Sequence, residues 1–293
     1  MTDVLPHWHD FAEITRAKEP LAPFTQLKIG GPAEALVEPR TAAELQAVLR
    51  RCAEQHLPWR VLGGGGNLLI RDEGVKGVVL RLSAPAFSGV EVRGRRIRAG
   101  AGASLASLIS HAGRHGLSGL EQFVGLPGTV GGALRNFAGD RFGDLGQRVV
   151  QVEGVDYQGQ AVVLQREELG ISAGLDEVVV VAAEFELDPD SPEGIVKRMR
   201  KAWIHRKASQ PFTFQSAVRM FKNPPGLSAT ALIEQAGLVG TRVGGAVVSD
   251  RDASYVVVEA GAGSRDVLRL LDLVRSRVEE KFNIELESDI TVW

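Results

Sequence analysis

The residues best suited to bind a ligand are glycines gathered in two runs. The first run, Gly63 to Gly66, follows the apolar pair Val61-Leu62 and precedes Asn67-Leu68-Leu69. Successive backbone N–H groups in a turn without side chains can converge on an anion such as a diphosphate. This is not the dinucleotide-binding fingerprint, because a strand and not a helix follows and the spaced pattern G-x-G-x-x-G is absent. A flexible hairpin turn is the alternative interpretation.

The second run is Gly125-Leu126-Pro127-Gly128-Thr129-Val130-Gly131-Gly132-Ala133, with Asn136 and Gly139 beyond it. Proline fixes φ, and the flanking glycines permit close approach of the backbone. This combination suits a rigid loop laid against a flat or phosphorylated ligand. A turn that serves only tight packing is the alternative.

Positive charge is concentrated in one stretch after residue 196. Its members, opposed only by Glu193, are Lys197, Arg198, Arg200, Lys201, Arg206, Lys207, Arg219 and Lys222. Such a run is typical of a solvated helix face. For His205, beside Arg206, we expect a place on the surface of this helix. No spacing of His, Asp and Glu indicates a metal site.

The composition is that of a globular chain. It has 293 residues, 44% of them apolar, and a formal net charge of −2. These values exclude disorder and give no global attraction to nucleic acid or to an anionic membrane. The lone Cys52 cannot form an internal disulfide, which fits a reducing compartment. No apolar window is long enough for a membrane span or a signal peptide, so we expect a cytoplasmic protein without membrane or nucleic-acid partners.

Periodicity and turn signals predict an α+β chain in two domains. A helix should begin at Thr41, with Glu44 completing a capping box, and end near Gln55. The run EVVVVAAEFEL is too continuously apolar for a half-exposed strand. Another helix carries an apolar stripe of Val267, Leu270, Leu271, Val274 and Val278. The turn-rich segment around Pro189 and Pro192 predicts a boundary, giving domains 1–190 and 191–293.

Together, these segments resemble one enzyme family, the UDP-N-acetylenolpyruvoylglucosamine reductases (UDP-N-acetylmuramate dehydrogenases). The resemblance covers the chain from about residue 20 to its last residues. The segments that carry it are Thr25 to Ala33, the GGGGNLL turn, Asp72-Glu73-Gly74, Gly100-Ala101-Gly102, Gly116 to Glu121, Gly125 to Ala133, Phe221 to Gly226, Leu232 to Leu238 and Arg242 to Ala246.

This resemblance implies an FAD-binding domain of the vanillyl-alcohol-oxidase (PCMH) type in residues 1–190 and a smaller α/β substrate-binding domain in residues 191–293. It implies a cytoplasmic, monomeric enzyme of peptidoglycan synthesis, and hence of cell wall biogenesis, cell shape and cell division. NADPH would reduce FAD, hydride would then pass to the β carbon of the enolpyruvyl group of a UDP-sugar, and an acid would protonate the α carbon.

The sequence departs from the family at positions that bear on the chemistry. Arg219 stands where the family has a serine or cysteine, and arginine is effectively never deprotonated in proteins. A tyrosine-arginine pair is missing after Glu167-Glu168-Leu169-Gly170, so one cation that stabilises an enolate is absent. Arg219 could supply that charge from another wall of the site. Asp289 matches a family glutamate and is the best remaining acid, with a solvated strand-end carboxylate as the alternative.

Three further departures concern binding. Gly66 replaces a serine and Phe137 an asparagine, which weakens hydrogen bonding to FAD, and Ser209 replaces a lysine near the UDP-sugar.

Site residues follow from the resemblance position by position. The catalytic candidates are Asp289 and Arg219. The FAD-binding candidates are Leu62, Gly63, Gly64, Gly65, Gly66, Asn67, Leu68, Pro127, Gly128, Thr129, Gly131, Gly132 and Gly139. Arg206, Lys222 and Asn223 match positions near the UDP diphosphate. The alternative function is that of a catalytically silent homologue that binds flavin or UDP-sugar.

Overall fold

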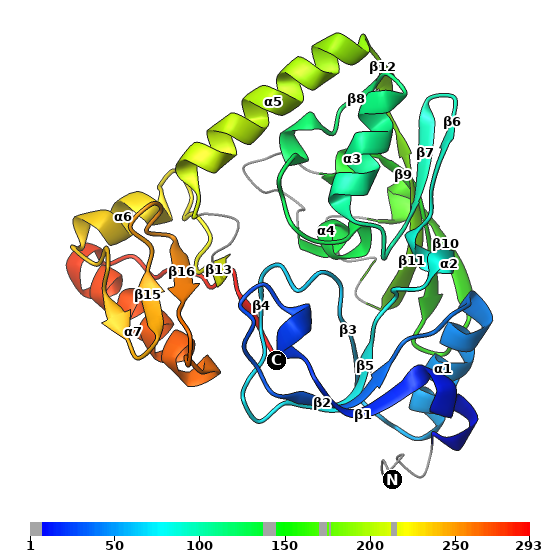
Figure 1. Cartoon of the computed structure of the whole chain (residues 1–293), viewed down its shortest axis with the longest axis horizontal. Helices are drawn as coiled ribbons and strands as arrows, with labels where there is room; N and C mark the ends of the chain where they lie inside the picture. Colours follow the sequence, from blue (N-terminus) through cyan, green and yellow to red (C-terminus); the bar gives the residue numbers. More distant parts are fainter. Residues whose placement is uncertain (1–7, 137–144, 170–174, 176, 212–215) are drawn as a thin grey trace. The chain divides into compact units, whose positions relative to one another are not determined.

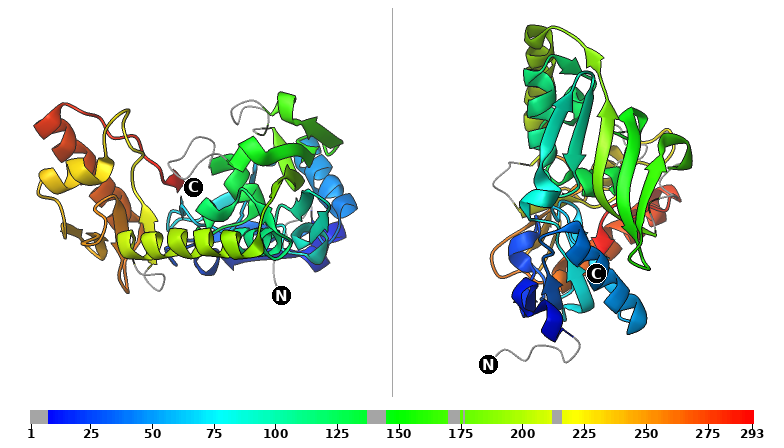
Figure 2. Two further views of the ribbon diagram at one scale, coloured as in Figure 1. Left: turned by 90° about the horizontal axis from the view of Figure 1, so that it is seen from above. Right: turned by 90° about the vertical axis from the view of Figure 1, so that its right-hand side faces the viewer.

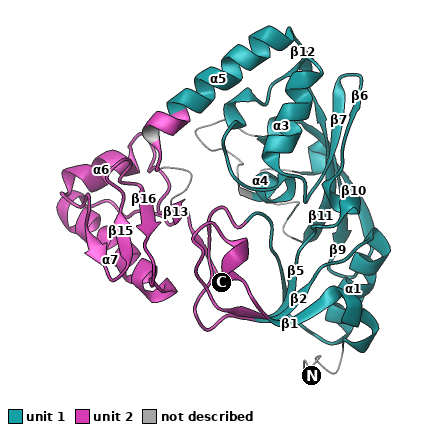
Figure 3. Ribbon diagram, viewed as in Figure 1, with its two compact units in different colours: residues 1–18, 34–64, 76–205 teal, residues 19–33, 65–75, 206–293 magenta. Residues whose placement is uncertain are grey.

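The computed structural model describes residues 8–136, 145–169, 175, 177–211 and 216–293. By their internal contacts, the residues divide into two compact units (Figure 3). Unit 1 consists of residues 1–18, 34–64 and 76–205, and unit 2 of residues 19–33, 65–75 and 206–293. The chain therefore passes from unit 1 to unit 2 within the first glycine run, between Gly64 and Gly65.

A four-stranded sheet belongs mainly to unit 1. Its order is β1 (Thr15–Pro20), β2 (Pro32–Val37), β5 (Val75–Leu80) and β3 (Trp59–Val61). Helix α1 (Ala42–Glu54) precedes β3, and the Thr41 hydroxyl accepts a hydrogen bond from the Glu44 N–H at 3.2 Å. The predicted helix start is confirmed. The Glu44 carboxylate, however, accepts from the Arg40 N–H at 2.6 Å, not from Thr41 as a capping box requires.

The second sheet of unit 1 has five antiparallel strands (Figure 1). Their order is β10 (Ala161–Gln165), β9 (Val149–Asp156), β11 (Val178–Glu186), β7 (Arg96–Gly100) and β6 (Val90–Arg93). The continuously apolar run forms β11, which has a neighbour on each side, and most of its residues are buried. The prediction of a buried strand is confirmed.

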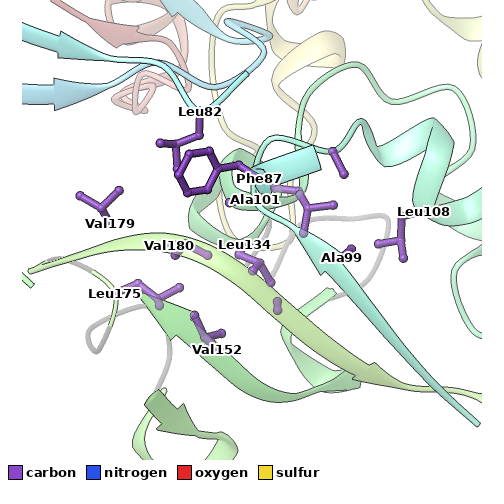
Figure 4. Packing of buried hydrophobic residues seen from close by; sticks show 14 of the residues in the cluster. Leu82, Phe87, Ala99, Ala101, Leu108, Leu134, Val152, Leu175, Val179 and Val180 are labelled. Carbon is purple, nitrogen blue, oxygen red and sulfur yellow. The ribbon is translucent and has the colours of Figure 1, made fainter. Parts of the chain in front are cut away.

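Helices α2 (Pro85–Ser88), α3 (Leu105–Arg114) and α4 (Val130–Asn136) accompany this sheet in unit 1. The core between them is built from aliphatic side chains around the fully buried Phe87 (Figure 4). Labelled members of this core are Leu82, Ala99, Ala101, Leu108, Leu134, Val152, Leu175, Val179 and Val180. Cys52 is a free thiol in the same core, and burial raises its pKa to about 12. The thiol therefore stays protonated and unreactive.

Several shorter helices and strands are found in unit 1, and one more, η2, lies in the unit 2 segment before β2. They are η1 (His9–Ile14), η2 (Ala22–Phe24), β8 (Leu117–Ser118), η3 (Glu121–Phe123), η4 (Leu145–Arg148), η5 (Arg166–Glu168) and β12 (Asp188–Pro189), which pairs with β8.

The predicted basic helix is α5 (Pro192–Ser209), one unbroken helix (Figure 1; Figure 2, left). Near its start, Arg198 donates to Glu121 Oε1 at 2.7 Å and to Asp190 Oδ2 at 2.6 Å. These bonds tie the first turns of α5 to the preceding sequence, and residues of this helix as far as 205 group with unit 1. The sequential domains 1–190 and 191–293 stay a prediction, since the compact units follow other bounds.

We expect Glu121→Gln to destabilise the protein. Burial raises the pKa of the Glu121 carboxyl, but hydrogen bonds from the Gly119 N–H and from Arg198 outweigh it and hold that pKa below its ordinary value. A carboxyl whose pKa is lower in the folded state stabilises that state above the unfolded-state pKa of about 4.3, and this contribution is lost as the pH falls. The variant should lose about 1–3 kcal/mol of unfolding free energy at pH 7.

Urea denaturation at pH 7 and at pH 3.5 measures this difference, which should shrink at the lower pH. Glu91→Gln is the matched control, because its carboxylate is 56% exposed and pairs only with Arg93 in the described contacts. A loss that is equal at both pH values would show that the charge of Glu121 is not the cause.

Unit 2 contains an antiparallel sheet and two helices. The sheet order is β13 (Ser216–Arg219), β16 (Tyr255–Val258), β15 (Ala246–Val248) and β14 (Arg242–Val243). The helices are α6 (Ala229–Gln235) and α7 (Ser264–Phe282). The predicted apolar stripe of α7 is confirmed, since all five of its members are buried in the core of this unit.

Two earlier segments of the chain complete unit 2. Leu27 and Leu69 are buried in the same core as Val218 and Ile233. Strand β4 (Leu68–Leu69) pairs in parallel with β17 (Thr291–Val292). In the described part of the chain, no helix is both long and apolar enough to cross a membrane.

Asp72 caps helix α7 from one of these segments. Its carboxylate oxygens accept from the Ser264 N–H at 3.0 and 3.1 Å, and the Ser264 hydroxyl accepts from the Asp72 N–H at 2.9 Å. A carboxylate at the start of a helix satisfies an unpaired N–H and lies at the positive end of the helix dipole.

We expect Asp72→Ala to lower the free energy of unfolding by about 1–2 kcal/mol. Thermal and urea denaturation measure this loss. Asp272→Ala on the same helix is the control, because the Asp272 side chain is 74% exposed and should cost less than about 0.5 kcal/mol. Equal losses in the two variants would contradict the capping role.

Candidate functional site

The two glycine runs touch each other in unit 1. A Cβ added at Gly64 would lie 2.6 Å from the Gly128 Cα, and one added at Gly63 would lie 2.8 Å from the Thr129 hydroxyl. Two backbones can approach this closely only where neither carries a side chain. Gly63 and Gly128 are half-buried and Gly64 is exposed, so the joined loops present bare backbone.

The second glycine run forms backbone hydrogen bonds with residues 101–105, which follow β7. Leu105 N–H donates to the Gly128 carbonyl at 3.1 Å, and the N–H groups of Val130 and Gly131 donate to Ala103 and Ala101 at 2.9 Å. A Cβ at Gly131 would meet the Ala101 Cβ at 2.9 Å, so packing alone accounts for this glycine. At Gly132 an added Cβ would make only an ordinary 3.4 Å contact, and packing does not demand a glycine there.

The remaining half of the first run belongs to unit 2. Gly65 has φ +59°, and a Cβ there would lie 2.3 Å from the Phe24 carbonyl oxygen. Its own carbonyl accepts from the Gln26 N–H at 2.9 Å. The Thr25-Gln26 segment therefore shapes the turn, and Gly66, Asn67 and Leu68 lead from it into β4.

Arg219 and Asp289 meet in unit 2, and Asn67 joins them. Arg219 Nε lies 3.4 Å from Asp289 Oδ2. Asn67 Nδ2 donates to the Asp289 carbonyl at 2.7 Å and to Asp289 Oδ2 at 3.2 Å. The side chains of Arg219 and Asp289 are 13% and 29% exposed. A cation and a carboxylate are thus held at a half-buried position, next to the residue that ends the glycine turn.

Backbone pairing on two sides brings these residues together. Before β17, Asp289 N–H donates to the Met220 carbonyl at 2.9 Å, and Lys222 N–H donates to the Glu287 carbonyl at 2.9 Å. The next residues pair with β4, where Thr291 N–H donates to the Asn67 carbonyl at 3.1 Å. Asp289 therefore lies between two sets of backbone hydrogen bonds, one with residues 220–222 and one with β4. These bonds fix its position from both sides.

The three candidates for binding a diphosphate also lie in unit 2. The Lys222 ammonium forms an ion pair with Glu287, and about half of the Lys222 side chain is exposed. Asn223 Oδ1 accepts from the Ala229 N–H at 3.0 Å, which leaves the amide nitrogen to donate to an anion. Arg206, near the end of α5, is only 6% exposed. No group of His, Cys, Asp and Glu in the described residues could hold a metal ion.

Some predicted site features lie outside the described residues. They are Gly139, Phe137 and the segment 170–174 from which the tyrosine-arginine pair is missing.

Sequence reasoning missed the residues that position the site. Met220 and Thr291 position the site through backbone groups, as does the carbonyl of Glu287, and backbone groups leave no signal in the side-chain pattern. The contact of Asn67 with Asp289 joins residues 222 positions apart. Of the residues that hold the second glycine run, only Ala101 lies in a segment whose glycines gave a local signal, Gly100-Ala101-Gly102.

Comparison with protein families yields two matches. Residues 33–165 match an FAD binding domain, and residues 210–293 match the C-terminal domain of UDP-N-acetylenolpyruvoylglucosamine reductase. The first match contains both glycine runs, and the second contains Arg219, Lys222, Asn223 and Asp289.

Whole-chain relatives carry the name of the same enzyme. UDP-N-acetylenolpyruvoylglucosamine reductase 2 of Symbiobacterium thermophilum is 42% identical, over 95% of this chain and 92% of the relative. The enzyme of Heliobacterium modesticaldum is 39% identical, over 97% of this chain and 92% of the relative. The enzyme of Bacillus subtilis is 33% identical, over 94% of this chain and 93% of the relative.

Solved structures extend the comparison to the fold. UDP-N-acetylenolpyruvylglucosamine reductase from Thermus caldophilus superposes with a TM-score of 0.80 at 36% identity, over 95% of this chain and 99% of the other. A solvent-stable cholesterol oxidase matches 62% of this chain and 39% of its own, with a TM-score of 0.51 at 18% identity, which shows a shared fold alone.

Proposed function

The chain belongs to the UDP-N-acetylenolpyruvoylglucosamine reductase family, and we propose on that basis that it reduces UDP-N-acetylglucosamine enolpyruvate to UDP-N-acetylmuramate with NADPH. The predicted fold class, α+β with an FAD-binding domain of the vanillyl-alcohol-oxidase type, is confirmed. The observation that carries the proposal is the contact of Arg219 with Asp289, a cation and an acid-base group held together.

The described backbone fits FAD, the family's cofactor. The joined loops at Gly64 and Gly128 leave no room for a Cβ between them and expose main chain, as a cradle for a diphosphate requires. We assign FAD binding to Leu62 through Leu68 and to Pro127, Gly128, Thr129, Gly131, Gly132 and Gly139. When bound, FAD supplies the transfer of hydride from NADPH to the substrate.

Arg219 would stabilise the charge that develops on the substrate. Addition of hydride to the β carbon of an enolpyruvyl group leaves negative charge on the α carbon and its carboxylate, as an enolate. A guanidinium that is already fixed in place stabilises such charge without reorganisation. The bond from Arg219 Nε to the Phe221 carbonyl at 3.2 Å, together with Asp289, fixes this side chain.

Asp289 would transfer the proton that completes the reaction. A carboxyl can give a proton to carbon directly or through a water molecule. To act as the acid in each turnover, the Asp289 carboxyl would take up its proton from solvent. Overall, NADPH supplies hydride to the β carbon and solvent supplies the proton to the α carbon.

Lys222, Asn223 and Arg206 would hold the UDP diphosphate. Diphosphates require cations and hydrogen-bond donors, and these side chains offer two charges and an amide. The Lys222–Glu287 ion pair must open or share its ammonium when the diphosphate binds.

Absorbance and stopped-flow measurements test this function. The purified protein should show an oxidised flavin spectrum, NADPH should bleach it without oxygen, and the enolpyruvyl substrate should then restore it. Bleaching by NADPH without reoxidation by this substrate would contradict the proposal. We also expect a monomer on gel filtration and, in cells, a cytoplasmic enzyme of cell wall synthesis that affects shape and division.

One observation favours a second function, that of a silent flavin- or UDP-sugar-binding homologue. Arg219 occupies the position of the family's serine or cysteine, and an arginine paired with a carboxylate offers no acidic proton. In that case the substrate would bind, but it would not reoxidise the reduced flavin. Turnover that appears only in Arg219→Ser would establish this function.

A further inference from the structure

The side chain of Asn67 is turned toward Asp289. Both of its neighbours, the Asp289 carbonyl at 2.7 Å and Asp289 Oδ2 at 3.2 Å, are hydrogen-bond acceptors. The group facing them must therefore be the amide nitrogen, since the amide oxygen would be repelled by both. An amide nitrogen carries two hydrogens, and these two contacts engage both of them.

This orientation limits what Asn67 can do for a phosphate. Its remaining polar atom, Oδ1, is an acceptor, and the oxygens of an FAD diphosphate are acceptors as well. A hydrogen bond from the Asn67 side chain to the diphosphate would require the loss of a bond to Asp289. Only the backbone of residue 67 can serve the cofactor while the contacts to Asp289 are kept.

The backbone reinforces the connection. The Asn67 carbonyl accepts from the Thr291 N–H, and the following residues pair in parallel, Leu68 with Thr291 and Leu69 with Val292. Asn67 and Asp289 therefore precede two strands of one ladder, and this ladder sets the distance between them. The contact belongs to unit 2 throughout.

We propose that Asn67 is a positioning residue, which orients the Asp289 carboxylate beside Arg219 for proton transfer, and that its side chain does not bind the FAD diphosphate. This inference rests on the proposed reductase function. The contacts of both Asn67 and Arg219 fall on Oδ2 of Asp289.

The reaction separates these roles, because its two half-reactions need different groups. Asn67→Ala and the more conservative Asn67→Ser should keep FAD affinity and the rate of flavin reduction by NADPH within about twofold of wild type. Reoxidation by the enolpyruvyl substrate should slow by about 10–100-fold in Asn67→Ala, as is common when a group that orients a reactive residue is lost. Asn283→Gly, which removes an asparagine side chain at φ +54° elsewhere in unit 2, should change neither step.

A double-mutant cycle supplies a readout that a general loss of structure would not give. If Asn67 acts through Asp289, Asn67→Ala should slow reoxidation little or not at all once Asp289→Asn is present. Asn67→Ser provides the same cycle if the alanine variant does not fold. Loss of FAD in the folded single variants, or fully additive slowing in the cycle, would overturn the proposal. A wild-type protein that cannot reoxidise its flavin with this substrate would refute the reductase function instead, whatever the Asn67 variants do.

Discussion

Replacing Arg219 with methionine should slow reoxidation of the reduced flavin by the enolpyruvyl substrate by about 10²–10³-fold. Loss of one preorganised group that stabilises a developing oxyanion typically has an effect of this size. Methionine retains length and apolar bulk, so the charge is the main property removed. Flavin reduction by NADPH involves no enolate and should keep its rate. Stopped-flow absorbance at the flavin band measures the two steps separately.

Two further variants make this result interpretable. Arg242→Met removes an arginine of the same unit that is 52% exposed and pairs with Glu259, and it should leave both steps unchanged. Arg219→Ser restores the family's usual residue. Because serine carries no charge and the tyrosine-arginine pair that would follow Gly170 is missing from the sequence, we expect this variant also to be slower than wild type. Turnover in Arg219→Ser together with none in the wild type would support the silent homologue.

Adding a single methyl group at Gly64 should weaken FAD binding by about ten- to hundredfold. The new Cβ would lie 2.6 Å from the Gly128 Cα and 3.1 Å from its carbonyl carbon, and neither backbone atom can move without shifting its loop. Overpacking of this kind costs about 1–3 kcal/mol, and about 1.4 kcal/mol corresponds to a tenfold change in Kd. Titration of the apoprotein with FAD, followed by flavin fluorescence, measures the change.

Gly89→Ala is the matched control for Gly64→Ala. Gly89 has φ −67°, and a Cβ there would find its nearest neighbour, the Pro85 carbonyl oxygen, at 3.9 Å. This variant should bind FAD as the wild type does. If Gly64→Ala retained full affinity with an unchanged melting temperature, the joined loops would not be the diphosphate cradle.

Features encoded by neighbouring residues could be predicted from the sequence. The start of α1 follows from Thr41, because a hydroxyl before a helix captures an N–H three residues on. The buried face of α7 follows from the spacing of Val267 to Val278, and the burial of β11 follows from its unbroken apolar run, Val178 to Ala183. Each depends on an interaction within one helical turn or one strand.

The geometry of the site could not be predicted in this way. Residues 65–75 join the unit formed by 206–293 because β4 finds its partner in β17, and nothing in Leu68-Leu69 specifies which strand that will be. Resemblance to the family named Asn67 as a residue that binds FAD. The direction of its amide depends on an Asp289 carbonyl far along the chain, which only the folded structure reveals.

The pairing of β4 with β17 has a consequence for how the protein is made. During translation, Leu68 and Leu69 are synthesised long before Thr291. These apolar residues are buried in the folded protein, but their strand partner is absent during most of translation. Contacts between residues so distant in the sequence form slowly. Folding intermediates that lack these contacts expose apolar surface and are prone to aggregation. A nascent chain stopped before residue 286 would carry both glycine runs and still lack the acid.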